Sequence, residues 1–129
     1  MRILITGSRT WDVKYKVDIV LNELFALSDV LGSQLVIVHG ACPTGADHYA
    51  SEWGAGRPDV KMEAWPADWK QYGKSAGPRR NEIMVDAGAD MCVAFLRNGS
   101  TGTRQTIALA RTAKIPTFVI DYDEEESDA

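Results

Sequence analysis

Three short segments of the sequence combine glycine with polar or charged side chains, a combination that suits the binding of an anion. They are Gly7-Ser8-Arg9, Gly40 through Asp47, and Asn98 through Thr103. Each follows a short apolar run and precedes a segment with helical spacing. A helix N-terminus offers unpaired N–H groups and the positive end of the helix dipole, and glycine lets the backbone approach a ligand closely. The segments therefore predict a phosphate-binding pocket, provided that the fold brings them together.

The alternation of apolar runs and helical segments predicts such a fold. Strands are expected at Arg2–Thr6, Leu35–His39, Val60–Ala64, Met91–Phe95 and Thr117–Ile120. Helices are expected from Val17 to Leu31, at Ala46–Trp53, at Pro78–Ala87 with Pro78 as first helical residue, and at Thr103–Ala113. We predict a single Rossmann-like α/β domain, a doubly wound parallel sheet of about five strands in the order 3-2-1-4-5 with helices on both faces. Ligands bind such sheets outside the carboxyl ends of the strands, here at the switch point between strands one and four.

Composition limits the function classes. The chain has 129 residues, of which 45% are hydrophobic and 25% charged, as in one soluble globular domain. Its formal charge is −4, but the last nine residues hold 6 of the 18 acidic side chains, which leaves 12 acids against 14 bases and a body of about +2. We expect residues 1–120 to form a ligand-binding domain and residues 121–129 to be a disordered acidic tail. A nearly neutral body lacks the basic surface that a duplex-DNA partner requires.

Neither a membrane partner nor a metal is expected. No apolar run approaches the ~20 residues that cross a bilayer, and the N-terminus does not have the pattern of a signal peptide, so we expect a cytoplasmic protein. Cys42 and Cys92 share no metal-ligand spacing. His39, Asp47 and His48 lack the i, i+4 spacing of helical metal ligands, and no cofactor is predicted.

A longer series of motifs resembles one protein family. The series is Gly7-Ser8-Arg9 with Trp11, His39-Gly40 with Gly45-Ala46-Asp47, Pro66-Ala67 with Trp69, Ala76-Gly77-Pro78-Arg79-Arg80-Asn81 with Met84, and Gly102-Thr103. It covers roughly residues 1–120 and is similar to the YspA-type branch of the SLOG superfamily, whose members are common in phages and bacteria. The resemblance implies a Rossmann-like domain for a nucleotide or an NAD- or ADP-ribose-derived ligand, and a homodimer formed through the helices that flank the site. The same superfamily contains the LONELY GUY phosphoribohydrolases, which release a base from a nucleoside monophosphate.

The predicted ligand-binding residues all lie in these motifs: Gly7, Ser8, Arg9, Gly40, Gly45, Ala46, Asp47, Arg80, Asn81, Gly102 and Thr103. Arg9 either pairs with a phosphate through its planar guanidinium or closes a surface salt bridge. Asp47 either accepts hydrogen bonds from ribose hydroxyls or is held at its helix N-terminus by the dipole alone. Two cations at a helix N-terminus, Arg79 and Arg80, oppose the dipole unless an anion lies beside them. We favour Arg80 as the site arginine, because it falls where the phosphoribohydrolases have a catalytic arginine.

This sequence differs from the phosphoribohydrolases at one residue that takes part in their reaction. Their Gly-Gly-x-Gly-Thr-x-x-Glu motif ends in a glutamate that takes part in breaking the N-glycosidic bond, and the matching position here is Thr106. Glycosidic cleavage passes through an oxocarbenium-like state that a nearby carboxylate stabilises. Only Asp47, or less favourably Glu82, could replace that glutamate. We therefore expect a binding protein, a sensor or a sequestering domain.

Two other functions stay open. The first is a nucleotide N-glycosidase with Asp47 and Arg80 as catalytic residues, and the less favoured one is single-stranded DNA binding. Among further candidates, the default role of His39 is structural, with a general base as the alternative. The aromatic residues Trp11, Trp65, Trp69 and Tyr72 are expected in the core or at a dimer contact, although one of them could stack on a base.

Overall fold

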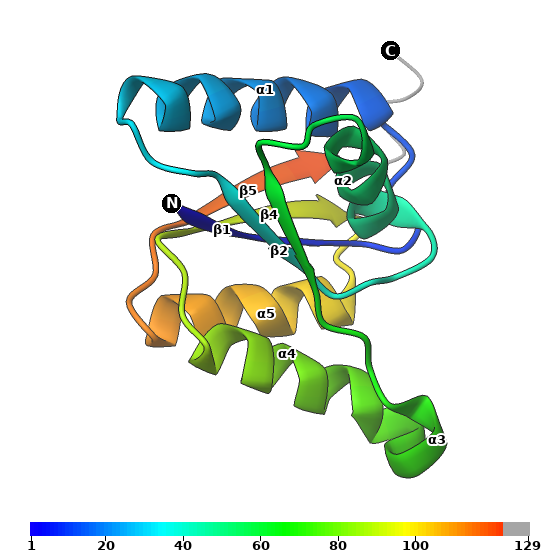
Figure 1. Ribbon diagram of the computed structural model, residues 1–129. Helices are drawn as coiled ribbons and strands as arrows, with labels where there is room; N and C mark the ends of the chain where they lie inside the picture. Colours follow the sequence, from blue (N-terminus) through cyan, green and yellow to red (C-terminus); the bar gives the residue numbers. More distant parts are fainter. Residues whose placement is uncertain (123–129) are drawn as a thin grey trace.

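The fold is built on one parallel sheet of five strands, in the order β3-β2-β1-β4-β5. This computed structural model describes residues 1–122 (Figure 1). The strands are β1 (Arg2–Gly7), β2 (Val36–His39), β3 (Lys61–Ala64), β4 (Met91–Arg97) and β5 (Thr117–Tyr122). All four neighbouring pairs are parallel. The predicted order 3-2-1-4-5 and the doubly wound α/β class are thus confirmed.

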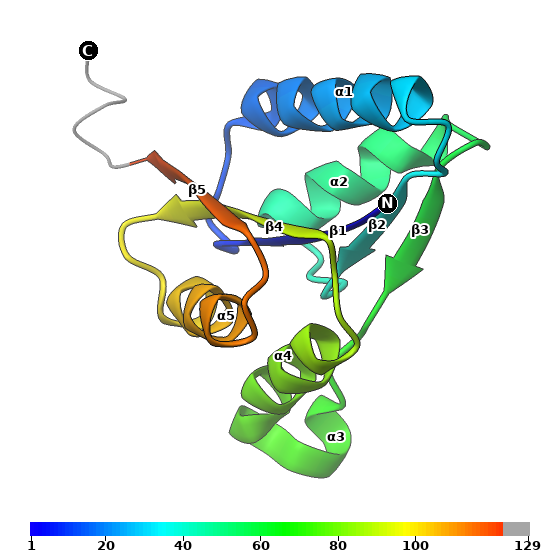
Figure 2. The ribbon, with the colours of Figure 1, turned by 90° about the vertical axis from the view of Figure 1, so that its left-hand side faces the viewer.

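Helices cover both faces of the sheet. Figures 1 and 2 show α1 (Lys14–Val30) and α2 (Gly45–Ala55) on one face, and α4 (Ala76–Asp86) and α5 (Thr101–Thr112) on the other. Successive residues of a strand point to opposite faces. Accordingly, Ile3 and Ile5 pack in a core with α1 and α2, whereas Leu4 packs in a second core with α4 and α5. Continuous apolar strands are therefore required, as the sequence indicated.

The short segment between β3 and α4 extends away from the sheet. It comprises α3 (Trp69–Tyr72) and the 3₁₀ turn Gly73–Ser75, neither of which the apolar periodicity predicted (Figures 1 and 2). Asp68 caps α3, since its Oδ1 accepts a hydrogen bond of 3.1 Å from the Gln71 N–H. Because α4 begins at Ala76, Pro78 is its third residue and not its first. The ring is tolerated there because the amides of the first helical turn lack intrahelical partners.

The last strand extends beyond its expected end. Asp121 and Tyr122 continue β5 in register with Leu96 and Arg97 of β4, so the sheet includes the first two residues of the expected tail. Residues 123–129, for which disorder was expected, lie outside the described part of the chain. Within residues 1–122, no helix is both long and apolar enough to cross a bilayer.

The switch point of the sheet lies between β1 and β4. Gly7 at the end of β1 is in register with Phe95, and the Ser8 N–H donates to the Phe95 carbonyl at 3.0 Å. The chain leaves β1 toward α1 on one face and leaves β4 toward α5 on the other. The two connections therefore separate at this point, and an opening is left at the carboxyl ends of the strands.

Candidate functional site

A cleft of about 800 Å³ occupies this opening. It lies at the carboxyl ends of β1 and β4 and reaches the N-terminal turns of α4 and α5. Its volume falls in the upper part of the range of small-molecule sites, roughly 300–1,000 Å³. Nine of the predicted residues line it: Gly7, Ser8, Arg9, Gly40, Asp47, Arg80, Asn81, Gly102 and Thr103. The structure thus brings residues from all three glycine-containing junctions to one cavity.

Gly45 and Ala46 do not line the cleft. A Cβ on Gly45, whose φ is +77°, would lie 2.2 Å from the Ser8 carbonyl oxygen. Ala46 is fully buried, and its Cβ would lie 2.4 Å from a Cβ placed on Gly7. These small residues allow the first turn of α2 to pack directly on the loop after β1. Their position therefore supports packing, whereas the sequence predicted ligand contact.

The buried hydroxyl of Ser8 is committed to the backbone. Its Oγ accepts a hydrogen bond of 2.9 Å from the Arg97 N–H and lies 3.3 Å from the Arg97 carbonyl oxygen, to which it donates. These bonds join the loop after β1 to the end of β4. Ser8 shapes the cleft by fixing one junction to the other.

The N-terminus of α5 is open toward the cleft. Thr101, Gly102 and Thr103 form its first turn, line the cleft, and include no acidic side chain. The N-cap residue Ser100 makes no side-chain capping bond, and among the described residues none accepts a hydrogen bond from the three amides of this turn. Asn98 and Gly99 precede it in left-handed conformations, with φ of 50° and 65°. This turn has the features of an anion-binding helix N-terminus.

Arg80 lines the cleft but also holds the framework together. Its Nη1 donates to the carbonyl oxygens of Gly40 and of Trp65, the latter at 3.2 Å, and its Nε donates to Asn81 Oδ1 at 2.7 Å. The guanidinium thus links α4 to the carboxyl ends of β2 and β3. Its Nη2 donates to no described residue and remains able to bind an anion. The sequence predicted only a ligand contact and missed this structural function, because the carbonyl partners belong to distant strands.

Asp47 is almost fully buried beside the loop after β2. Its Oδ2 accepts hydrogen bonds from the Gly40 and Cys42 amides at 3.2 and 3.3 Å, while its Oδ1 has no hydrogen-bond partner within the described residues. Burial raises the pKa of the Asp47 carboxyl, although His39, the Cys42 amide and Arg80 act in the opposite direction. One oxygen is therefore structural and the other is available to a hydrogen-bond donor.

His39 and Cys42 flank this carboxylate. The Ala41 N–H donates to His39 Nδ1 at 3.0 Å, so the neutral imidazole must carry its proton on Nε2. Burial lowers the pKa of His39, while Asp47 raises it and Arg80 lowers it further. Burial also raises the pKa of the Cys42 thiol, which opposes thiolate formation in this loop. Neither the imidazolium nor a reactive thiolate is favoured here.

Arg9 and Arg79, both considered as anion ligands from the sequence, differ in their position relative to the cleft. Arg9 lines the cleft, with its Cζ 5.2 Å from the ring centroid of Trp69. Arg79 does not line the cleft; it lies over Tyr72 at 4.5 Å, and its Nε donates to Ser75 Oγ. The expected conflict between Arg79 and the helix dipole is thus reduced by an aromatic partner, with no need for an anion beside it.

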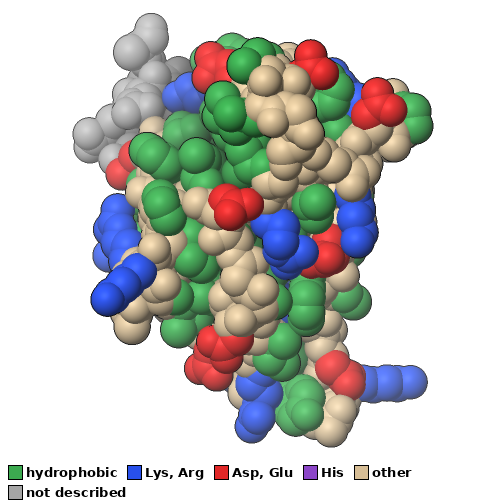
Figure 3. Space-filling view, turned by 60° about the vertical axis from the view of Figure 1, so that its left-hand side comes forward, with side chains coloured by type: hydrophobic (Ala, Val, Ile, Leu, Met, Phe, Trp, Pro, Cys, Tyr) green, Lys and Arg blue, Asp and Glu red, His purple; other side chains and the backbone are tan. Residues whose placement is uncertain are grey.

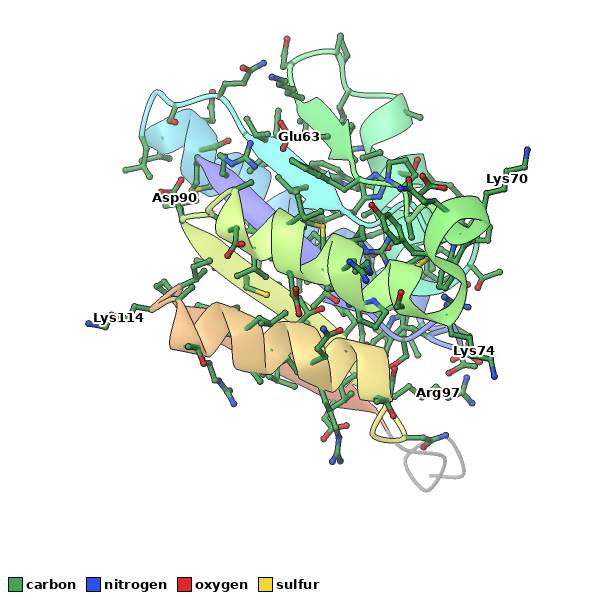
Figure 4. The ribbon with its side chains drawn as sticks, turned by 90° about the horizontal axis from the view of Figure 1, so that it is seen from below. Glu63, Lys70, Lys74, Asp90, Arg97 and Lys114 are labelled. Carbon is green, nitrogen blue, oxygen red and sulfur yellow. The ribbon has the colours of Figure 1, made fainter. Side chains whose placement is uncertain are left out.

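Arg97 and Gln105 are among the polar residues that line the cleft but were not predicted as ligand-binding residues. Arg97 is the last residue of β4, whose predicted end at Phe95 was two residues too early. It forms an ion pair with Asp12 at 3.3 Å. Figure 4 shows Arg97 at the same end of the molecule as Lys74, opposite Lys114.

Gln105 accepts a hydrogen bond of 3.0 Å from Asn81 Nδ2, which ties α5 to α4. Its place in the first turns of α5 is the feature of the sequence that could have indicated a position beside the cleft.

Thr106, which stands where the phosphoribohydrolases have their glutamate, does not line the cleft. Thr106 is fully buried, and its hydroxyl donates to the Gly102 carbonyl of its own helix at 3.2 Å. Glu82 is exposed and also does not line the cleft. Among the residues described, Asp47 is the one acidic side chain that lines it. No group of three or more His, Cys, Asp or Glu residues within 1–122 is arranged to hold a metal ion.

Comparisons with known proteins identify the family of the chain. The model of the YspA, cpYpsA-related SLOG family matches residues 1–72. The chain is 42% identical over 120 residues to the Gene 61 protein of Mycobacterium phage D29, an alignment that covers 89% of this chain and 92% of that protein. No solved structure gave a match. The chain therefore belongs to the YspA, cpYpsA-related SLOG family, whose membership suggests a nucleotide-related ligand.

Proposed function

We propose that this protein binds a nucleotide or an NAD- or ADP-ribose-derived molecule in the cleft and acts as a sensor or a sequestering protein. The observation that carries the proposal is the open first turn of α5, whose amides have no acceptor among residues 1–122 and which lines the same cleft as Arg9 and Arg80. Amides at a helix N-terminus and a guanidinium are complementary to a phosphate group.

The charges of the lining support an anionic ligand. Arg9, Arg80 and Arg97 line the cleft against the single carboxylate of Asp47 among the described residues. On the face shown in Figure 3, acidic and basic side chains are interspersed. A concentrated cationic cleft on a mixed surface suits a small anion better than a long duplex.

The Asp47 carboxylate supports recognition of a sugar. Its Oδ1 is buried without a partner among residues 1–122, and an unpaired buried acceptor costs free energy that a ligand donor would recover. A ribose hydroxyl is such a donor. Asp47 would thus recognise the sugar while the first turn of α5 holds the phosphate.

Ligand binding without turnover follows from the same arrangement. Glycosidic cleavage needs a carboxylate and a positioned water near the anomeric carbon. Thr106 has no carboxylate. The Oδ2 of Asp47 already accepts the two amide hydrogen bonds that hold the loop after β2. The alternative function is a nucleotide N-glycosidase in which Asp47 acts with Arg80, and it is favoured by the cleft position of both side chains.

The experiment that tests the proposal is native mass spectrometry of protein purified gently from cells, followed by calorimetry with AMP, NAD and ADP-ribose. We expect either a retained nucleotide-sized mass or saturable binding of at least one of these molecules. An absence of both would contradict the proposal. Binding to a single-stranded oligonucleotide that weakens steeply with salt, in place of nucleotide binding, would instead favour the DNA-binding alternative.

The homodimer is a separate part of the proposal, and it rests on the family resemblance. On the helices that flank the site, Ile83 of α4 is an exposed large apolar side chain. Sedimentation equilibrium of the wild type and of Ile83→Lys tests this part. A dimer that the substitution dissociates would support it, and a wild-type monomer at all concentrations would contradict it.

A further inference from the structure

The cleft contains one exposed indole ring. Trp69 lines the cleft and is 48% exposed, whereas Trp11 is buried in the core and in edge contact with Phe95. Trp65 donates through Nε1 to Glu63 and does not line the cleft, and neither does Tyr72. Of the four aromatic residues that the sequence offered, the structure brings Trp69 alone to the candidate site.

Trp69 lies at the start of α3, and one edge of its ring packs against α4. Trp69 is the first residue of α3, directly after the capping residue Asp68. A Cβ on Gly77 of α4 would lie 3.1 Å from Cη2 of the ring, so the absence of a side chain there lets the indole edge pack against the helix. A flat ring held by its edge leaves a face available for stacking.

That face is covered by the Arg9 guanidinium. The Arg9 Cζ lies 5.2 Å from the ring centroid. A base inserted between the two groups would need two contacts of about 3.5 Å each, roughly 7 Å in all. The pair as it stands has no room for a base, so Arg9 must move away before a planar ligand can stack on this face of the ring. Arg9 is exposed and follows the Gly7-Ser8 turn, and its released guanidinium could then pair with a phosphate.

We propose that Trp69 is the stacking platform for the ligand's nucleobase and that Arg9 covers this platform until the ligand displaces it. This inference rests on the proposed nucleotide-binding function. It adds that the base of the nucleotide is recognised by Trp69. A cationic ligand is a poorer occupant of the ring, because Arg9, Arg80 and Arg97 line the same cleft. Stacking on an aromatic side chain tolerates any base, since every base has a π face.

The test compares two ligands that differ only in the base. Wild type, Trp69→Leu and Trp69→Phe are titrated by calorimetry with AMP and with ribose 5-phosphate. We expect wild type to bind AMP more tightly than ribose 5-phosphate, and Trp69→Leu to lose about fivefold to 150-fold in AMP affinity, the usual range for stacking on one base. Ribose 5-phosphate should bind both proteins equally, and Trp69→Phe should retain most of the AMP preference.

Tyr72→Leu is the matched control, because Tyr72 is 40% exposed on the same short helix but contacts Arg79 outside the cleft. It should leave both affinities unchanged. Equal AMP affinity in Trp69→Leu and wild type would overturn the platform while leaving the phosphate site intact. If wild type bound none of AMP, ribose 5-phosphate, NAD and ADP-ribose, the proposed function would fail first, and the platform would fail with it.

Discussion

Arg80 occupies the space that a side chain at position 40 would require. A Cβ on Gly40 would lie 2.6 Å from Arg80 Nη1 and 2.7 Å from Cζ. The same guanidinium donates to the Gly40 carbonyl and to the Trp65 carbonyl. The glycine after β2 is therefore needed for the close approach of an arginine from α4, and this contact helps to form one wall of the cleft.

Gly40→Ala should lower the free energy of unfolding by about 1–3 kcal/mol, because the displaced guanidinium leaves two backbone carbonyls without their donor. Urea unfolding measures the change. Gly56→Ala is the matched control, since Gly56 follows α2 at a φ of −96° and a Cβ there would meet nothing within 4 Å. Equal loss of stability in both variants would show that the Arg80 contact contributes nothing specific.

Asp47→Asn and Asp47→Ala should have different effects on stability at pH 7. Asparagine keeps an oxygen for the Gly40 and Cys42 amides and removes a charge whose pKa burial raises, so stability should be unchanged or higher. Alanine leaves both amides unpaired and should cost about 1–3 kcal/mol. Thermal unfolding of the three proteins distinguishes these outcomes. A large loss in Asp47→Asn would mean that the ionised form is required by the fold.

The pH dependence of stability should reflect His39. Because burial lowers its pKa, the unfolded chain takes up a proton near pH 6.5 that the folded chain does not. His39 therefore destabilises the fold as the pH falls below 6.5 and through the lowered pKa. His39→Asn keeps an acceptor for the Ala41 amide without this titration, so its stability should fall less between pH 7 and pH 5.

Urea unfolding at several pH values tests this expectation, with His48→Asn as a control for losing the other histidine, which is half-buried on α2 and paired with Glu52. Parallel pH profiles for wild type and His39→Asn would show that protonation of His39 does not contribute to acid destabilisation.

Turnover of a bound nucleotide should be near background. A positioned acid or base contributes about 10²–10⁴-fold in rate, and the cleft has no second carboxylate among the described residues. Chromatography for free base after long incubation with nucleoside monophosphates, NAD and ADP-ribose measures it. Multiple turnovers that Asp47→Asn abolishes would instead support the N-glycosidase.

The sequence predicted the fold well, because the features that determine it are local. Apolar runs such as Ile3-Leu4-Ile5 must be covered on both faces, and right-handed crossovers leave few strand orders. The location of the cleft could be predicted from the strand order, because the carboxyl ends of parallel strands share one edge of the sheet. Gly7, Arg80 and Thr103 line one cavity, whereas Gly45, which was predicted with them, does not.

The functions of single side chains were less predictable, because they depend on partners that are distant in the sequence. Arg80 bonds to carbonyls at positions 40 and 65, and Gly45 packs against Ser8. Neither pairing leaves a periodic or spacing signal. The same applies to Trp69, which the sequence could not distinguish from three other aromatic residues until α3 was located beside Gly77 and Arg9.

The most direct test of the central claim removes one amide from the first turn of α5. Thr101→Pro should fold normally, because proline is favoured at the first helical position and Ser100, with φ −46° and ψ 127°, already has the conformation that precedes proline. Calorimetry with the tightest ligand among AMP, NAD and ADP-ribose should show a loss of about tenfold or more, the cost of one hydrogen bond to a charged group. Lys114→Ala, which removes a cation at the opposite end of the molecule (Figure 4), should bind as wild type does. Undiminished binding in a folded Thr101→Pro protein would contradict the claim that this turn holds the ligand's phosphate.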